Sequence, residues 1–441
     1  MVPRAPATAL ATALAAFAVA APAHAADPRQ DEQWGLEMIG APAAWSTSTG
    51  VGALIAVIDT GAQLDHPDLA GRFVDGHDFV GDDPIESGDE DDDPSDGNGH
   101  GTHVTGIAVA NRNNGEGIAG VAPGARVLPL RVLDDDGAGY ADDTIKAIDM
   151  AIDRGVHVIN LSLGDFVPLQ STLFEDPAYE AVLKRAVAEG IVVVIAAGNN
   201  TLPKCENPNV DGIVCVGAVD SDGRRSAFSS FGSNVDLMAP GGSGPGGTDM
   251  DVLSTWNDGD YFGISGTSQA TPHVAGVAAL LVSLGVRGQA AADRMSATAA
   301  EPASPFDGAG IVDAAAAVEG LAPPPAPPGT GPGDPDGPAD PARGSFSTKR
   351  KLKLRAVRRR GFRVRCVAVR PGRCRVVVRH RGRRIARGRD DVPAQIATRV
   401  TAELNRAGRR RMKRVRRRTR VKLSVTLPGE SARAVRVKIR R

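Results

Sequence analysis

The sequence predicts an α/β fold in which helices cover a mostly parallel central sheet, followed by a small antiparallel β domain at the C-terminal end. Short and almost continuously apolar runs alternate with longer amphipathic stretches over residues 51–321, which is typical of strands that helices cover on both faces. Beyond residue 344, polar and apolar residues instead alternate with a period of two. With 441 residues, of which 42% are hydrophobic, the chain can form a full core and two or three domains.

These runs give the expected strands and helices of the α/β part. Strands are expected at residues 53–59, 126–133, 157–163, 191–197 and 213–219. Helices are expected at residues 141–154, 177–189 and 267–284, because each of these stretches ends at a glycine: Gly155, Gly190 and Gly285.

Composition divides the chain into four segments. Residues 1–25 have the pattern of a signal peptide, with Arg4, an Ala-rich apolar run and the cleavage site Ala23-His24-Ala25. An N-terminal membrane anchor is the weaker alternative, because the run is short for a span and polar residues follow it at once. The α/β domain then occupies residues 26–320, a Pro/Gly-rich linker residues 321–343, and a basic, Arg-rich β domain residues 344–441. We therefore expect a mature protein without a transmembrane span that is secreted or associated with the cell envelope.

Charge is distributed unevenly along the chain, although the formal net charge is zero. Residues 344–441 hold 36 of the 52 Lys and Arg residues and only 4 of the 52 Asp and Glu residues. Such a domain could neutralise phosphates, but Phe346 and Phe362 are its only aromatic residues, so stacking on bases has little support. We expect it to bind anionic polymers of the cell envelope or the acidic α/β domain, and we do not expect nucleic acid as a partner.

The four cysteines lie in two close pairs. An exported protein meets an oxidising environment, which favours disulfides over the alternative of four reduced thiols. Three pairings are possible, and the most economical joins Cys205 to Cys215 and Cys366 to Cys374. Because Cys366 and Cys374 flank a Pro-Gly turn signal, we expect their disulfide to staple a hairpin across its turn.

Three segments carry residue types suited to nucleophilic catalysis. Asp59 ends the first expected strand, at the sheet edge where α/β folds place their sites, although an Asp at this position is often only a turn former. His100 is flanked by glycines that permit close approach; a metal pair with His103 is the weaker alternative, since no third ligand has suitable spacing. Ser268 begins a long helix, where serine is commonly an N-cap but where the helix dipole also favours negative charge.

In the order Asp, His, Ser, these segments resemble the subtilisin-like serine proteases, the subtilase family. The stretches Val-Ile-Asp-Thr-Gly, Gly-His-Gly-Thr-His and Gly-Thr-Ser-Gln-Ala-Thr-Pro-His-Val-Ala-Gly match its motifs, and the resemblance covers residues 34–320. It implies a three-layer subtilisin-like fold and a serine endopeptidase that hydrolyses protein and peptide substrates without an organic cofactor. His100 would act as the general base for Ser268, and Asp59 would orient its ring.

The same resemblance implies an oxyanion hole and a substrate cleft. Asn199 matches the asparagine whose side-chain amide faces the oxyanion of the transition state, and the backbone N–H of Ser268 would be the second donor. Five residues match the strands that line the cleft and pair with an extended peptide: Ser162, Leu163, Gly164, Ala197 and Gly198. No residue can be assigned from the sequence as a charged floor of the S1 pocket, so broad or apolar specificity is the default expectation.

Calcium is the ion that the resemblance implies. A strong site would join Gln30, Asp68 and Asn114, whose hard oxygen ligands suit Ca²⁺, and Asp236 resembles the carboxylate of a weaker second cation site. The acidic run at residues 82–96 could bind another ion, but such runs are more often simply solvated.

Two features depart from the family pattern. Gln269 follows Ser268, where the family commonly has methionine or another bulky apolar residue. Few residues lie between Ala25 and Trp34, so we expect no room for the usual folding pro-domain. A second class of function, an exported binding protein with an inactive protease domain, stays open, although all four catalytic residue types are present.

Overall fold

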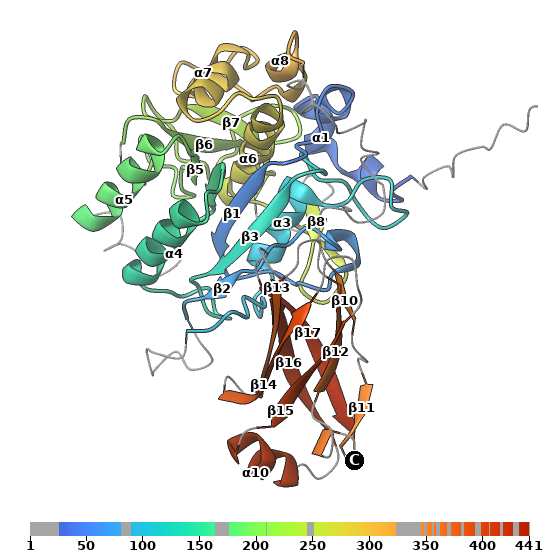
Figure 1. The fold of residues 1–441 in the computed structure, drawn as a ribbon. Coiled ribbons are helices and arrows are strands. Elements are labelled where there is room, and N and C mark those ends of the chain that lie inside the picture. The colour runs from blue at the N-terminus through green and yellow to red at the C-terminus, as the bar shows by residue number, and fades with distance from the viewer. Residues whose placement is uncertain are drawn as a thin grey trace, which may run out of the picture.

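The computed structural model describes residues 26–80, 90–163, 176–208, 210–244 and 251–322 of the chain. Within the C-terminal region it describes residues 345–347, 351–354, 357–358, 362–367, 372–380, 383–392, 398–404, 406–414, 418–426 and 432–440. The first set forms an α/β unit, and the second forms a β-rich unit (Figure 1). In these ranges we find no helix with the length and apolar character that a membrane span requires.

A parallel sheet lies at the centre of the α/β unit. Its strands are β1 (Leu54–Asp59), β2 (His77–Asp78), β3 (Arg126–Arg131), β4 (Val158–Leu161), β5 (Val192–Ala196), β6 (Ile213–Val219) and β7 (Leu237–Pro240). They are arranged in the order β2-β3-β1-β4-β5-β6-β7, and each neighbouring pair is parallel. The carboxyl ends of the strands therefore meet at one edge, where α/β folds place their ligands.

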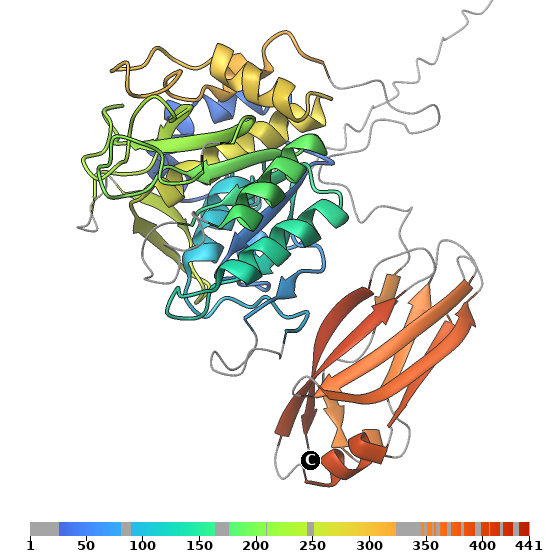
Figure 2. The same cartoon turned by 90° about the vertical axis from the view of Figure 1, so that its left-hand side faces the viewer.

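Helices cover both faces of this sheet and make three layers (Figures 1 and 2). On one face lie α3 (His100–Val109) and α6 (Thr267–Ser283), and on the other lie α4 (Ala141–Asp153) and α5 (Pro177–Ala188). Successive residues of β1 alternate between the two cores: Val57 packs in the cluster of Val274 in α6, and Ile58 in the cluster of Ile148 in α4. Four shorter helices complete the unit: α1 (Trp34–Met38), α2 (Ala41–Ala44), α7 (Gln289–Ala297) and α8 (Ala314–Val318).

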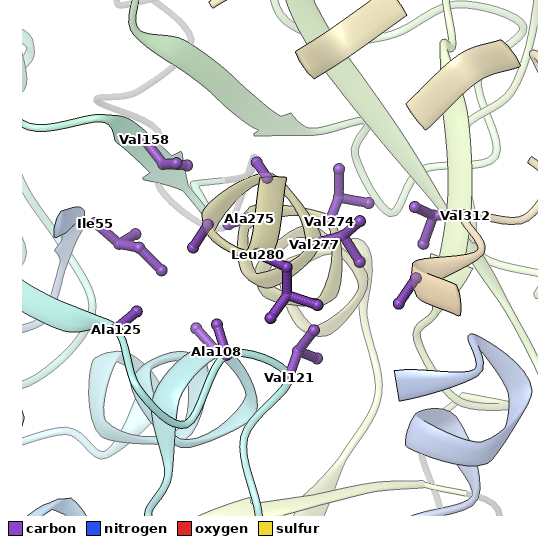
Figure 3. Packing of buried hydrophobic residues seen from close by; sticks show 14 of the residues in the cluster. Ile55, Ala108, Val121, Ala125, Val158, Val274, Ala275, Val277, Leu280 and Val312 are labelled. Atoms are coloured by element: carbon purple, nitrogen blue, oxygen red, sulfur yellow. The ribbon is translucent and has the colours of Figure 1, made fainter. Parts of the chain in front are cut away.

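Helix α6 is buried along nearly its whole length, and its small residues permit close packing. In Figure 3 it lies among side chains of the sheet and of the segments around α3, including Ile55, Val158 and Val121. A Cβ atom added to Gly276 would lie 2.5 Å from the Cβ atom of Val121, so the backbones approach too closely for any larger residue. This packing gives the first turn of α6 a rigid support.

All five strands and three helices expected for the α/β unit are present, with bounds within two residues of those expected. Four strands are additional. Besides β2 and β7, an antiparallel ribbon of β8 (Val252–Thr255) and β9 (Tyr261–Ile264) packs on α3. Each of these strands has four residues or fewer, too short for a periodic pattern to stand out.

The C-terminal unit contains an eight-stranded sheet, and its described residues include the helix α10 (Arg406–Arg414). Its strands are β10 (Ser345–Ser347), β11 (Lys351–Lys353), β12 (Phe362–Val367), β13 (Gly372–His380), β14 (Arg383–Val392), β15 (Thr398–Leu404), β16 (Arg418–Thr426) and β17 (Ala432–Arg440). Their order is β10-β12-β15-β14-β13-β16-β17-β11, and all pairs are antiparallel except β11 with β17. The predicted small antiparallel β structure is confirmed.

The prediction of a hairpin that joins the strands of Cys366 and Cys374 is wrong. Strand β12 carries Cys366 and pairs with β10 and β15, whereas β13 carries Cys374 and pairs with β14 and β16. A turn signal predicts that the two strands beside it pair with each other, but strands later in the sequence can pair with them instead. Here β14 and β15 lie between them in the sheet.

Candidate active site

Residues far apart in the sequence meet at the carboxyl edge of the central sheet. Asp59 is the last residue of β1, His100 is the first residue of α3, and Ser268 lies in the first turn of α6. His100 and Ser268 line one cavity of about 300 Å³ together with Asn199 and Ser162. The structure therefore brings the residues predicted as acid, base, nucleophile and oxyanion donor into one site.

The carboxylate of Asp59 holds the ring of His100. Its Oδ1 lies 2.7 Å from His100 Nδ1 and accepts a second hydrogen bond of 2.7 Å from the backbone N–H of Thr60. An ionised carboxylate only accepts, so Nδ1 carries the proton and Nε2 has a lone pair available as a base. Asp59 is fully buried, whereas the side chain of His100 is 25% exposed and can be reached from the cavity.

The surroundings of His100 make its ring more basic. Burial lowers the pKa of the imidazole, but the charge and hydrogen bond of Asp59 and the charge of Asp96 outweigh this effect, and the pKa is raised. The imidazolium that forms when the ring accepts a proton is therefore stabilised.

This shift predicts the pH dependence of activity. If His100 is the general base that the sequence predicts, it accepts a proton only when its ring is neutral, and kcat/KM should rise with pH through a midpoint above 6.5, the ordinary histidine value. The measurement is kcat/KM on one peptide over a pH series. The variant Asp96→Asn removes one of the charges that raise the pKa, so its midpoint should be lower. A wild-type midpoint below 6.5 would contradict the assignment.

Asp96, the last residue of the acidic run, organises the start of α3. Its Oδ1 accepts hydrogen bonds from the hydroxyl of Thr60 and from two backbone N–H groups, and its Oδ2 accepts two from Thr102. Thr60 in turn accepts from the N–H of Gly101. These bonds connect the end of β1 to the first turn of α3, and so hold Asp59 and His100 in register.

The backbone carbonyl of Ser268, in the first turn of α6, accepts no hydrogen bond from the residue four positions later in the helix. Pro272 lies four residues after Ser268 and has no N–H, so it cannot bond the Ser268 carbonyl. The hydroxyl of Ser162 donates to this carbonyl at 2.8 Å, and the hydroxyl of Ser268 donates to the Ser162 carbonyl at 3.1 Å. Ser162 therefore fixes the backbone beside Ser268 as well as lining the cavity.

The side-chain amide of Asn199 has a fixed orientation. Its Oδ1 accepts hydrogen bonds from the backbone N–H of Thr267 at 2.9 Å and from the Thr267 hydroxyl at 3.0 Å. A backbone N–H can only donate, so the oxygen must face Thr267 and the NH₂ group must point away from it. Since Asn199 lines the cavity next to Ser268, its NH₂ group is placed as a donor there.

His103 is a core residue and not a metal ligand partner of His100. It is fully buried, and its Nε2 lies 3.1 Å from the Val252 carbonyl and 3.0 Å from the Phe262 carbonyl. Burial lowers the pKa of His103 to about 3, so the ring is neutral and donates from Nε2. The bonds attach α3 to the β8-β9 ribbon.

The expected cleft residues are placed as follows. Ser162 and Leu163 line the cavity, as does Gln269. Ala197 and Gly198 are buried and lead directly into Asn199. Gly164 lies outside the described residues.

A second polar cluster surrounds Asp68. Its Oδ1 accepts a hydrogen bond of 2.9 Å from the side chain of Asn114, and its Oδ2 accepts from the N–H of Ile118. The N-terminal side chain in this cluster is Asp27, which accepts from the N–H groups of Asn113 and Asn114. Gln30 is not among the described hydrogen-bond partners of Asp68.

Asp27 and Asp68 are two buried carboxylates that repel one another. Burial and the charge of Asp27 raise the pKa of Asp68 to about 7, and burial raises the pKa of Asp27 as well. A divalent cation would remove this repulsion, so the cluster fits the Ca²⁺ that the sequence predicts. The sequence analysis did not name Asp27 as a ligand, because no sequence motif marks it; only the neighbouring Pro28 sets it apart.

The other predicted cation positions lack a comparable cluster. Asp236 accepts a hydrogen bond of 2.8 Å from the N–H of Cys215, and burial raises its pKa. In the described end of the acidic run, Glu90 and Asp92 both lie 3.6 Å from the ring of His77, while residues 81–89 lie outside the described residues. Across the described part of the chain, no three His, Cys, Asp or Glu side chains gather as metal ligands.

The predicted disulfide between Cys205 and Cys215 is confirmed, with its two Cα atoms 6.5 Å apart. It ties the segment after Asn199 to β6. Cys374 is also disulfide-bonded, while the side chain of Cys366 lies outside the described residues.

Comparison with known proteins agrees with this architecture. Residues 50–305 match the model of the subtilase family, peptidase family S8. The chain is 44% identical to thermitase from Thermoactinomyces vulgaris over 57% of this chain and 83% of the relative. It is also 44% identical to a thermophilic serine proteinase from Bacillus sp. strain AK1, over 58% of this chain and 59% of the relative.

Solved structures of proteases share the fold as well. A protease from Pseudoalteromonas arctica PAMC 21717 superposes with a TM-score of 0.60 at 34% identity, covering 67% of this chain and 98% of that one. One conclusion follows from three observations: the order of the strands in the sheet, the meeting of Asp59, His100 and Ser268, and a family match over more than half of the residues. The chain belongs to the subtilase family and is a subtilisin-like serine endopeptidase that acts on protein substrates.

Proposed function

We propose that Ser268 is the nucleophile, His100 the general base, Asp59 the residue that orients His100, and Asn199 an oxyanion donor. The observation that carries this assignment is the single cavity lined by His100, Ser268 and Asn199, with the His100 ring held 2.7 Å from Asp59. The fixed amide of Asn199 supports the role of oxyanion donor.

The mechanism follows from the chemistry of these groups. Nε2 of His100 accepts the proton of Ser268 Oγ as the oxygen attacks the carbonyl carbon of the peptide bond. Asp59 stabilises the imidazolium, and Asn199 and the N–H of Ser268 stabilise the negative charge on the carbonyl oxygen. His100 then gives its proton to the leaving amine. In the second step His100 accepts a proton from water as the water attacks the acyl carbon, and it returns this proton to Ser268 Oγ as the acyl–oxygen bond breaks.

A serine-directed fluorophosphonate probe tests the assignment. Wild-type protein and Ser46→Ala, a control serine exposed on the surface, should be labelled, and Ser268→Ala should not. Labelling of Ser268→Ala at the wild-type rate would contradict the assignment. Absence of labelling in calcium-loaded wild type would favour an inactive protease domain that serves only in binding.

We also propose that Asp27, Asp68 and Asn114 hold a structural calcium ion. A cation between Asp68 and Asn114 would replace their hydrogen bond and neutralise the paired carboxylates. The ion would supply stability only, since the cluster is separate from the residues that line the catalytic cavity.

The raised pKa of Asp68 predicts how the calcium effect varies with pH. Without metal, the folded protein keeps this carboxyl protonated up to a pKa of about 7, so stability from this group is lost as pH rises from about 4 to about 7. Calcium favours the ionised form, so the rise in Tm between EDTA and Ca²⁺ should be a few degrees larger above pH 7 than near pH 5.

Thermal unfolding of two variants separates this site from general charge effects. Asp68→Asn should lose most of the calcium-dependent rise in Tm, while Asp293→Asn, an exposed control on α7, should keep it. A calcium response in Asp68→Asn equal to that of wild type would contradict the site.

We further infer that residues 26–320 form the peptidase domain, that residues 344–441 form a separate basic domain, and that the protein is exported. The signal-like residues 1–25 and the Cys205–Cys215 disulfide support export.

The basic domain would bind anionic surfaces, either envelope polymers or the acidic peptidase domain; Lys422 donates to the backbone carbonyl of Asp92 in the acidic run. Retention of the full chain on an anionic glycan and on DNA, each across a salt series, tests the choice.

A further inference from the structure

A carboxylate lies against the backbone next to Asn199. A Cβ atom added to Gly198, the residue before Asn199, would lie 2.1 Å from both Cδ and Oε1 of Glu206. Gly198 also has a φ of 106°, which favours glycine. The space that a side chain at residue 198 would occupy is therefore filled by an acidic group.

The backbone around Glu206 is held firmly. The N–H of Glu206 donates to the carbonyl of Ala197 at 2.9 Å. Before it, Cys205 is bonded to Cys215 in β6, and after it the buried Asn207 donates to the Ala196 carbonyl at 2.9 Å. The carboxylate is thus presented in one place, without a large loss of conformational freedom when a ligand binds.

The charge of Glu206 has no cationic partner among the described residues. Its Oε1 accepts a hydrogen bond of 2.6 Å from the hydroxyl of Ser230, and its Oε2 accepts one of 3.1 Å from the side-chain amide of Asn200. Both donors are neutral, and a carboxylate has about four acceptor positions. A partly buried negative charge therefore remains available for a cation.

The place of this charge relates it to one position of the substrate. On the proposed roles, Asn199 and the N–H of Ser268 hold the oxygen of the scissile carbonyl, which belongs to the substrate residue P1. The Cβ atom of the P1 side chain is two bonds from this carbonyl carbon. The family resemblance places Ala197 and Gly198, the backbone that leads into Asn199, on the strands that line the substrate cleft. A lysine side chain carries its ammonium group on a flexible four-carbon stem, so it can extend past the carbonyl site toward a carboxylate that lies against this backbone segment.

We propose that Glu206 determines specificity, and that the enzyme prefers substrates with Lys or Arg at P1. The inference rests on the proposed roles of Asn199 and Ser268. A charge-assisted hydrogen bond from Lys or Arg to a preorganised carboxylate contributes both energy and selectivity. It replaces the apolar default that the sequence suggests, because that default assumed no charged group in the S1 pocket.

The test compares P1 lysine with P1 norleucine, which has the same straight stem without the ammonium group. For wild type, kcat/KM should be roughly 10- to 100-fold higher on the lysine peptide. In Glu206→Gln, which has the same shape but replaces one of the two acceptor oxygens with a donor NH₂ group and removes the charge, this ratio should fall close to one. Glu206→Lys should prefer glutamate at P1, and Glu180→Gln, on α5 with a side chain that is 46% exposed, should retain the wild-type ratio.

The outcomes separate this inference from the proposed function. Equal rates on both peptides in wild type, or an unchanged ratio in Glu206→Gln, would overturn the role of Glu206 while leaving the catalytic residues intact. Loss of hydrolysis of every peptide, together with loss of fluorophosphonate labelling, would instead overturn the proposed function. If Glu206 only held Ser230 and Asn200 in place, Glu206→Gln would change Tm and the rates on both peptides alike.

Discussion

Replacing His100 with alanine should lower kcat by about 10⁶, the size of effect known for the same replacement in subtilisin. The reason lies in the geometry around Asp59. Nδ1 of His100 is bonded to a fully buried carboxylate at 2.7 Å, which leaves the lone pair of Nε2 to act as a base on a ring whose pKa is raised. Without the ring, Ser268 would have to attack as a neutral hydroxyl.

The loss should appear in kcat far more than in KM, because the ring acts on the transition state. Single-turnover kinetics on a peptide ester and an amide measure it directly. His157→Ala, at the opposite end of the sheet, serves as the control, since the hydrogen bond that its ring makes to the described part of the chain is one accepted from the N–H of Leu54. A decrease of less than about tenfold in His100→Ala would exclude this residue as the base.

Replacing Asn199 with alanine should lower kcat by roughly 10² to 10³, the loss typical of one oxyanion donor. The amide can donate to the transition state because Thr267 holds its oxygen with two hydrogen bonds. The ground-state substrate gains little from this donor, so KM should change little.

A matched variant examines the orientation of the amide. Thr267→Val removes the hydroxyl donor but keeps the N–H that bonds Asn199 Oδ1 at 2.9 Å. Its kcat should fall by much less than that of Asn199→Ala, because one of the two orienting bonds remains. If Asn199→Ala kept wild-type kcat, the assignment of the oxyanion donor would be wrong.

The sequence was most informative about the α/β unit. Strands such as β1 and β5 are apolar on both faces and are followed by turns, so their positions could be predicted closely. Strands of four residues or fewer, such as β2 and β7, were missed because their pairing depends on neighbours far away in the sequence. The same reason explains the wrong hairpin, since the order β12-β15-β14-β13 is decided by long-range contacts.

The candidate site divides in the same way. Asp59, His100 and Ser268 lie in sequence segments with strong local signals, and their meeting follows from the parallel sheet. Asp27 and Glu206 have no local signal of this kind. Asp27 becomes a candidate ligand only because the fold brings it to the N–H of Asn114, and Glu206 becomes a candidate for specificity only because it fills the space beside Gly198.

A double-mutant cycle on His100 and Ser268 tests the central claim that these residues act as one catalytic unit. The measurement is kcat for the wild type, His100→Ala, Ser268→Ala and the double variant on one peptide. If the two act as a unit, each single replacement should cost about 10⁶, and the double variant should be no worse than either one. Losses that multiply in the double variant, or a single variant that retains wild-type kcat, would contradict the account.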